Sequence, residues 1–159
     1  MIINKDLLKN NAASLGIELS DEEISRFDML AERLIEQNKT MNLTAITEPD
    51  EVVIKHFVDS ISLVKAIDIN KVETVIDVGT GAGFPGIPLK IAFPHLNVVL
   101  LDSLNKRIKF LNTVIDELDL KNIKTIHGRA EDYAKQTEYR EQFDLCVSRA
   151  VANLSTLSE

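Results

Sequence analysis

The residues best placed to do chemistry lie in a glycine-rich stretch, VIDVGTGAGFPGIPLK, at positions 75–90. Glycine lacks a Cβ atom and tolerates positive φ, so such a turn can bring the backbone close to a ligand. N–H groups at the start of the following helix can then hold an electronegative ligand group. Gly81, Gly83 and Gly86 match G-x-G-x-x-G, and Asp102 lies 21 residues beyond Gly81, close to the spacing of an acid that binds a ribose. The stretch predicts a site for a cofactor that contains a nucleoside.

Two cofactors fit the glycines equally well, and the neighbouring side chains separate them. A nicotinamide dinucleotide such as NAD carries a negative pyrophosphate, beside which the carboxylate of Asp77 costs Coulomb energy. S-adenosyl-L-methionine carries a positive sulfonium and a positive ammonium group, which the same carboxylate stabilises. Phe84 and Pro85 stand where a dinucleotide turn needs free N–H groups. We therefore expect S-adenosyl-L-methionine, with an NAD-dependent oxidoreductase as the alternative.

Short apolar runs alternate with helical patterns from about residue 71 onward, which is typical of a parallel sheet covered by helices. The predicted strands span residues 74–78, 98–101, 123–126 and 143–147. The predicted helices between them span residues 88–93 and 104–120, with a shorter one near 131–136. The candidate ligand-binding positions follow predicted strands, at the edge where open α/β sheets bind ligands.

The expected strand order leaves the sheet unfinished. In a doubly wound sheet the first strand is central, the next two step outward on one side, and the fourth begins the other side. The fourth run, FDLCV, would then be an edge strand of buried composition with an unpaired ladder. We therefore predict an α/β fold whose Rossmann-like sheet is truncated after its fourth strand, in a natural protein that continues beyond Glu159.

A helical segment of residues 1–70 precedes the cofactor-binding domain of residues 71–159. Ser20 stands three residues before Glu23, which is the spacing of a capping box at a helix start. Apolar residues then recur at helical intervals until residues 38–47 break the pattern with Asn and Thr. The sequence therefore predicts a helix that begins after Ser20 and ends in a polar loop.

A third helix is predicted to start near Thr47, with Pro49 tolerated in its first turn. His56 and Asp59 stand three residues apart in it, so they share a face. We expect these two side chains to take part in hydrogen bonds of helix packing rather than to reach the active site.

Composition and charge bound the possible partners. The 159 residues include 25 acidic and 18 basic ones, for a formal net charge of −7. This balance argues against a broad nucleic-acid-binding surface but allows a local basic patch, and Lys106, Arg107 and Lys109 form one tight cluster.

The apolar runs are too short to span a bilayer, and the N-terminus lacks the apolar core of a signal peptide. With one cysteine and no metal-ligand spacing of histidines, we expect a cytoplasmic monomer without a metal.

Six stretches spread over the chain resemble one known family. They are MNLTAIT, KHFVDSISL, IDVGTGAGFPGIPLKIAFP, LLDSLNKRIKFL, HGRAED and SRAVANL. Together they resemble the bacterial 16S (small-subunit) ribosomal RNA guanine-N7 methyltransferases of the RsmG, or GidB, family. The resemblance implies a Rossmann-like class I methyltransferase sheet, S-adenosyl-L-methionine as methyl donor, and small-subunit ribosomal RNA or the 30S particle as partner.

The resemblance also implies which residues line the donor pocket. The implied positions follow predicted strands, and they are Gly79, Phe84, Asp102, Ala130, Glu131 and Arg149. Asp102 would accept hydrogen bonds from the ribose hydroxyls of the donor. The adenine end of the donor would lie beside Ala130 and Glu131.

The implied reaction needs no acid or base from the protein. N7 of guanine has a free lone pair, so its methylation removes no proton beforehand. The task of the enzyme is then to hold N7 in line with the sulfonium methyl group, and we name no catalytic residue. The target base is expected in unpaired RNA, because A-form helices hide N7 in a deep, narrow groove. A truncated chain that acts only as a ribosome-associated binding module is the second alternative.

Overall fold

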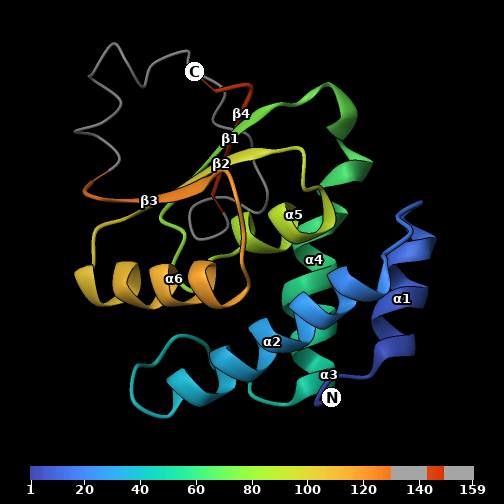
Figure 1. Ribbon diagram of the computed structural model, residues 1–159, viewed down its shortest axis with the longest axis horizontal. Helices are drawn as coiled ribbons and strands as arrows, with labels where there is room; N and C mark the ends of the chain where they lie inside the picture. The colour runs from blue at the N-terminus through green and yellow to red at the C-terminus, as the bar shows by residue number, and fades with distance from the viewer. Residues whose placement is uncertain (130–142, 149–159) are drawn as a thin grey trace.

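The computed structural model describes residues 1–129 and 143–148, which form an α/β fold around a parallel sheet (Figure 1). The strands of this sheet are β1 (Thr74–Val78), β2 (Asn97–Asp102), β3 (Ile123–His127) and β4 (Leu145–Val147). Their order is β3-β2-β1-β4, and all three pairings are parallel. The predicted order, with the first strand central and the fourth on the other side, is confirmed.

Two helices connect the first three strands and cover one face of the sheet. They are α5 (Gly86–Ala92) and α6 (Asn105–Glu117). Figure 1 shows both on the same side of the sheet, as right-handed crossovers between parallel strands require when the strands step in one direction. The predicted helix 104–120 ends earlier, at Glu117, because Asp119 takes a left-handed conformation with a φ of 53°. The helix predicted near 131–136 lies outside the described residues.

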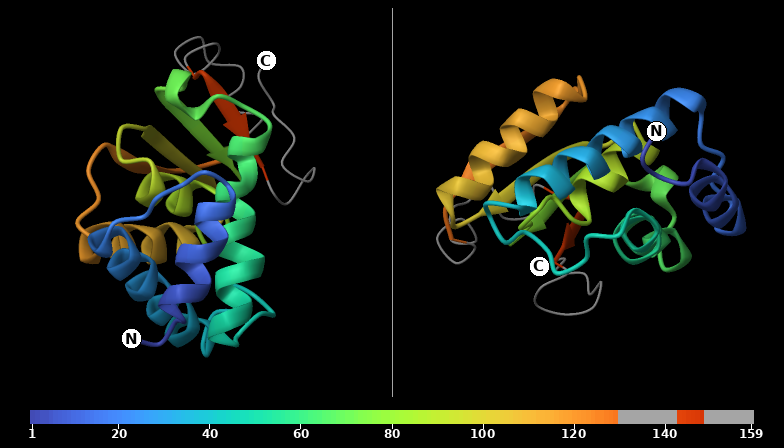
Figure 2. Two further views of the ribbon diagram at one scale, coloured as in Figure 1. Left: turned by 90° about the vertical axis from the view of Figure 1, so that its right-hand side faces the viewer. Right: turned by 90° about the horizontal axis from the view of Figure 1, so that it is seen from below.

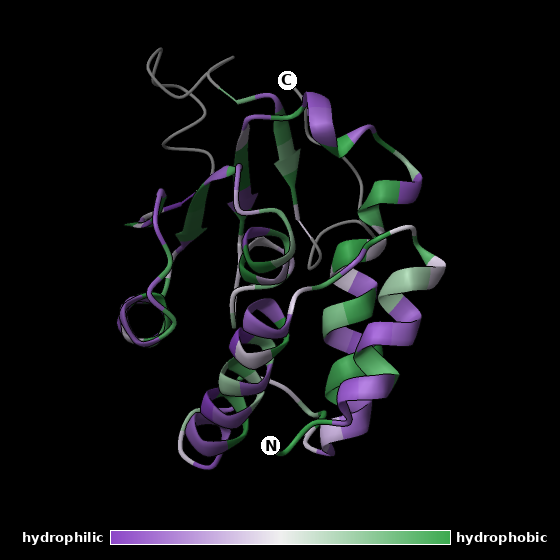
Figure 3. Cartoon of the chain, turned by 45° about the vertical axis from the view of Figure 1, so that its right-hand side comes forward, coloured by the Kyte–Doolittle hydropathy of each residue, from purple (hydrophilic) through white to green (hydrophobic). Residues whose placement is uncertain are grey.

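The face of the sheet under these helices is apolar in alternate positions. Val75, Val98 and Leu100 belong to the hydrophobic core, together with Leu145 from β4. Neighbouring residues in a strand point to opposite faces, so these four side chains lie on the helix-covered face. Figure 3 shows the strands coloured largely as hydrophobic.

The N-terminal part of the chain is helical, as predicted. It begins with α1 (Lys5–Ser14) and α2 (Asp21–Asn38). The predicted capping box is present, because Glu23 N donates to Ser20 Oγ at 3.1 Å and Ser20 N donates to Glu23 Oε1 at 2.9 Å. Ion pairing of Arg33 with Glu117 joins α2 to the end of α6.

The third helical stretch contains a π-helical section that the sequence analysis did not predict. It consists of α3 (Pro49–Val52), η1 (Val53–Val58), α4 (Asp59–Ile61) and η2 (Ser62–Lys65), and a short turn η3 (Ile69–Lys71) follows. From α3 to α4 the buried residues come as adjacent pairs, which are Val52 and Val53, His56 and Phe57, and Ser60 and Ile61. This repeat of four exceeds the 3.6 residues of an α-helical turn, and the wider turn of η1 takes up the difference.

The N-terminal helices and the sheet share one hydrophobic core. Contacts join α2 to both α5 and α6, and α4 to α5, so the N-terminal helices lie on the outer side of α5 and α6 (Figure 2). Phe27 from α2 and Phe57 from η1 are completely buried, with ring centroids 5.0 Å apart. The hydrophobic core therefore runs across residue 70, where the sequence analysis placed its boundary. No helix within residues 1–129 or 143–148 is long and apolar enough to cross a membrane.

The edge strand β4 is aligned on β1 by a side chain that precedes it. Asp144 Oδ2 accepts hydrogen bonds from Glu73 N at 2.8 Å and Thr74 N at 3.2 Å, and Asp144 N donates to Thr74 Oγ1 at 2.9 Å. Strand β4 begins at Leu145, two residues later than predicted, because Asp144 makes these side-chain bonds instead of ladder bonds. The two backbone N–H groups lower the pKa of the Asp144 carboxyl below its usual 3.8.

We predict that Asp144→Ala lowers the melting temperature at pH 7 and that this deficit shrinks in acid. A carboxyl whose pKa is lowered by folding stabilises the folded state above its unfolded pKa, and this contribution disappears as pH falls through the folded pKa. Melting curves of the wild type and the variant at pH 7 and below pH 3.8 would measure the change. Asp116→Ala, an exposed carboxylate on α6, is the matched control. A deficit that is constant with pH would contradict the assignment.

Candidate functional site

The glycine turn connects β1 to α5 and lies against the end of β2. Gly79, Gly81 and Gly83 have positive φ values of 68°, 60° and 100°, which side chains with a Cβ atom rarely adopt. The N–H groups of Gly79 and Thr80 both donate to Leu101 O, at 2.8 and 3.0 Å. The turn is therefore fixed to the carboxyl end of the neighbouring strand, at the edge of the sheet where the sequence analysis expected a ligand.

Asp102, at the end of β2, accepts hydrogen bonds from two backbone N–H groups, one in the glycine turn and one just before α6. Its Oδ2 accepts a hydrogen bond from Gly81 N at 2.8 Å, and its Oδ1 accepts one from Leu104 N at 2.9 Å. Arg107 Nη1 lies 3.6 Å from Oδ2. The structure thus brings together two residues, Gly81 and Asp102, that the sequence analysis assigned to one cofactor site. The carboxylate is only 2% exposed, so little of it is open to solvent.

Asp77 lies beneath the turn and is completely buried. Its Oδ2 accepts hydrogen bonds from Thr80 Oγ1 at 2.7 Å and from Gly86 N at 2.8 Å. A Cβ atom at Gly86 would collide with Leu100 and with the Asp77 carboxylate itself, so only glycine allows α5 to begin this close to the sheet. Asp77 therefore holds the turn and the helix start, and its charge can reach a ligand only across the turn.

Six N–H groups of the turn are already bonded within the protein. Besides those of Gly79, Thr80, Gly81 and Gly86, the N–H groups of Gly83 and Phe84 donate to Thr80 O at 3.0 and 3.1 Å. The expectation that helix-start N–H groups hold an electronegative ligand group therefore needs correction. These six donors have partners in the protein, and two of the acceptors are carboxylates.

Phe84 in the turn stacks on a histidine from the N-terminal helical segment. The rings of His56 and Phe84 have centroids 4.5 Å apart and an angle of 11° between their planes. His56 Nε2 and Thr44 Oγ1 lie 2.8 Å apart and share a hydrogen bond. Three family-like stretches of the sequence, at residues 41–47, 55–63 and 76–94, thus meet in the Thr44–His56–Phe84 contact.

The sequence analysis weighed two roles for His56, a hydrogen bond of helix packing and a contact with the active site, and the observed contact has elements of both. Its expected hydrogen bond within the helical segment is present, to Thr44, and the ring also packs against a predicted donor-binding residue. The available sequence feature was the four-residue spacing of Val53, Phe57 and Ile61, because His56 stands next to Phe57 and is buried with it.

The structure describes three of the six residues that the resemblance assigns to the donor pocket. Gly79 and Phe84 lie in the turn at the carboxyl end of β1, and Asp102 lies at the carboxyl end of β2. Ala130, Glu131 and Arg149 lie outside the described residues. Their roles in the donor pocket stay predictions.

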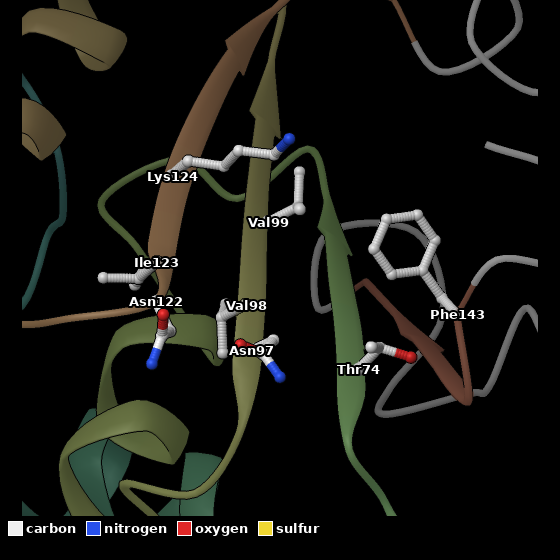
Figure 4. A pocket seen from close by; sticks show the side chains of 8 residues that line it. All are labelled: Thr74, Asn97, Val98, Val99, Asn122, Ile123, Lys124 and Phe143. Atoms are coloured by element: carbon white, nitrogen blue, oxygen red, sulfur yellow. The ribbon is translucent and has the colours of Figure 1, made fainter. Parts of the chain in front are cut away.

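A cavity elsewhere on the sheet is separate from this site. It has a volume of about 270 Å³ and lies at the amino ends of the strands, as Thr74, Val99, Lys124 and Phe143 in Figure 4 mark out. Open α/β sheets bind ligands at the carboxyl ends of their strands, so we do not assign the cofactor to it. Within the described residues, three or more His, Cys, Asp or Glu side chains nowhere gather in a way that could hold a metal ion.

Comparison with known sequences identifies close relatives. A family profile described as "GidB: rRNA small subunit methyltransferase G" matches residues 23–159. The "Ribosomal RNA small subunit methyltransferase G" of Lachnoclostridium phytofermentans is 58% identical over 146 residues, which cover 92% of this chain and 60% of that protein. The protein of the same name from Clostridium perfringens is 54% identical over 154 residues, with coverages of 97% and 64%. The chain thus spans 60–64% of the length of these two relatives.

Two solved structures with a similar fold are named as methyltransferases. A protein-L-isoaspartate O-methyltransferase matches 91% of this chain and 47% of its own with a TM-score of 0.56 and 13% identity. An O-methyltransferase from Bacillus cereus, solved in complex with SAH, matches 76% of this chain and 53% of its own with a TM-score of 0.51 and 20% identity. Likeness at these identities shows the fold alone, and it confirms the predicted Rossmann-like class I methyltransferase sheet.

We predict that His56→Ala weakens binding of S-adenosylhomocysteine by about two- to tenfold, because an aromatic pair contributes about 0.5–1.5 kcal/mol. His56→Phe keeps a ring against Phe84 and should retain most of the affinity. Calorimetric titration would measure both. His95→Ala is the matched control, because His95 Nε2 lies against the carbonyls of Ile69 and Val72, away from the turn. Wild-type affinity in His56→Ala would contradict a role of the stack in the donor site.

Proposed function

Because the chain belongs to the GidB family, rRNA small subunit methyltransferase G, we propose that it transfers a methyl group from S-adenosyl-L-methionine to N7 of a guanine in small-subunit ribosomal RNA. The family match extends over residues 23–159. It therefore includes the turn, Asp102 and the Thr44–His56–Phe84 contact. The proposed substrate is 16S RNA, free or in a 30S particle, and the proposed acting form is a cytoplasmic monomer.

The observation that carries the choice of cofactor is the internal bonding of the glycine turn. Six of its N–H groups donate to acceptors in the protein, and the carboxylates of Asp77 and Asp102 lie on either side of it. A pyrophosphate would meet occupied donors and the negative charge of Asp77, which opposes its own charge. A sulfonium ion needs no N–H donor and is stabilised by the same charge. The NAD-dependent oxidoreductase is therefore not favoured.

We propose the following roles around the donor. Asp102 accepts hydrogen bonds from the ribose hydroxyls, for which each carboxylate oxygen has a lone pair beyond its present bond. Gly79 allows the backbone to approach the donor, and Phe84, held by His56, forms an apolar wall. Ala130 and Glu131 are assigned to the adenine end and Arg149 to the pocket on the family resemblance.

The proposed methyl transfer requires no acid, base or nucleophile from the side chains of this protein. The methyl donor, when bound, supplies an activated methyl group and a neutral leaving sulfur. Guanine N7 presents its lone pair without losing a proton. The residues of the site therefore act by binding, orienting and excluding water, which agrees with a site built from backbone, two carboxylates and packed rings.

We predict that Asp77→Asn separates the charge of this residue from its role in the turn. An amide oxygen can still accept hydrogen bonds from Thr80 and Gly86, while the negative charge is lost. The affinity for S-adenosylmethionine should fall about tenfold, or ~1.4 kcal/mol, whereas S-adenosylhomocysteine, which keeps the ammonium group but has a neutral sulfur, should lose less affinity. Calorimetry with both ligands measures the difference. An equal loss for both ligands would contradict an interaction of the Asp77 charge with the sulfonium.

The proposed reaction is tested by incubating the chain with methyl-labelled donor and unmethylated small-subunit RNA. We expect label in that RNA, mapped to guanine N7 by strand cleavage at 7-methylguanosine, and none in large-subunit RNA. Asp102→Ala removes the acceptor for Gly81 and Leu104 and should lower the rate on the order of tenfold or more. Label on another atom would refute the N7 assignment. Binding of donor without transfer would favour the alternative of a ribosome-associated binding module.

A further inference from the structure

A second cavity lies between the N-terminal helices and the start of α6. It has a volume of about 450 Å³, within the range of ligand-binding pockets. Gln37 and Asn42, from the end of α2 and the loop after it, line one side of this interhelical groove. Leu104, Lys106 and Arg107 line the other side. The groove is therefore formed by two parts of the chain that are far apart in sequence.

The charge in the interhelical groove differs from that of the whole chain. The formal net charge is −7, yet the described residues that line the groove include two cations and no carboxylate. The other lining groups are amides, a hydroxyl and apolar side chains. Arg107 is paired with Asp102, so Lys106 supplies the positive charge of the groove. A cation with hydrogen-bonding groups around it suits a ligand that carries phosphate and hydroxyl groups.

The interhelical groove also adjoins the candidate donor site. Two of its lining residues contact Asp102, since Leu104 N donates to Oδ1 at 2.9 Å and Arg107 Nη1 lies 3.6 Å from Oδ2. One layer of residues thus separates the groove from the carboxylate assigned to the donor ribose. A polymer lying in the groove can reach the carboxyl edge of the sheet with an adjacent residue.

The interhelical groove also has exposed apolar surface. Leu104 is 50% exposed at the groove, one of few large apolar side chains among the described residues that reach this exposure. An apolar side chain there can cover the face of a ribose or an unstacked base, while Gln37 and Asn42 can bond a 2′-hydroxyl. Single-stranded RNA presents these groups together.

We propose that the interhelical groove binds the sugar–phosphate backbone of the acceptor RNA beside the target guanine, with Lys106 as a phosphate contact. The inference rests on the proposed function, because it assigns a docking surface to the RNA that this function requires. The acidic composition of the chain argues against a broad RNA-binding surface, but a local basic patch is sufficient for phosphate contacts.

The test compares Lys106→Ala and Lys106→Glu with the wild type in binding to unmethylated small-subunit RNA transcribed in vitro. We expect Lys106→Ala to weaken RNA binding on the order of fivefold at moderate salt, and to reduce the slope of log affinity against log salt by about 0.7–0.9. Lys106→Glu should weaken binding further. Lys71→Ala, an exposed lysine near the amino end of β1, is the matched control and should bind RNA as the wild type does.

Affinity for S-adenosylhomocysteine and the melting temperature are measured on the same variants. Both should stay at wild-type values, because Lys106 makes no contact with Asp102 among the bonds that fix the turn. Wild-type RNA affinity and salt slope in both Lys106 variants would overturn the groove while leaving the proposed function intact. Failure of the wild type itself to bind small-subunit RNA would overturn both.

Discussion

A carboxylate buried away from water, that of Asp77, is the constraint on which the site depends. Burial of a charged group is costly unless hydrogen bonds replace its hydration, and Thr80 and Gly86 supply two of them. These bonds fix how sharply the chain turns after β1 and how close α5 begins to the sheet. Glycine at position 86 follows from the same constraint, because a Cβ atom there would meet Asp77 and Leu100. The position of Gly81 against Asp102 depends in turn on this geometry.

The N-terminal helices take part in the site rather than merely preceding it. Their apolar sides join the core that α5 and α6 form on the sheet, and His56 reaches the glycine turn itself. The loop after α2 is tied to the same histidine through Thr44 and also lines the interhelical groove. One segment thus contacts both the candidate donor site and the candidate RNA surface. The orientation of the proposed donor site relative to the proposed RNA surface is therefore set by packing across residue 70.

The sequence predicted the features that depend on local pattern. Strands β1 to β3, their order and the capping box at Ser20 followed from hydrophobic periodicity, chain connectivity and residue spacing. The sequence did not predict the π-helical section, because apolar residues spaced about four apart are also typical of an ordinary α-helix. The partners of the turn N–H groups were also missed, because acceptors such as Thr80 O and Asp102 become visible only once the chain has folded back on itself. The stack of His56 on Phe84 joins residues 28 positions apart, beyond the reach of any local pattern.

The internal bonding of the glycine turn has a consequence for turnover. A loop that must order around its ligand loses conformational entropy on binding and regains it on release. Here bonds within the protein hold the shape of the turn, since its N–H groups donate to Leu101, Thr80, Asp102 and Asp77. Departure of the spent donor leaves none of these six N–H groups unsatisfied. If the chain has the proposed activity, the turn can exchange product for fresh donor without refolding, and it adds no ordering step to the cycle.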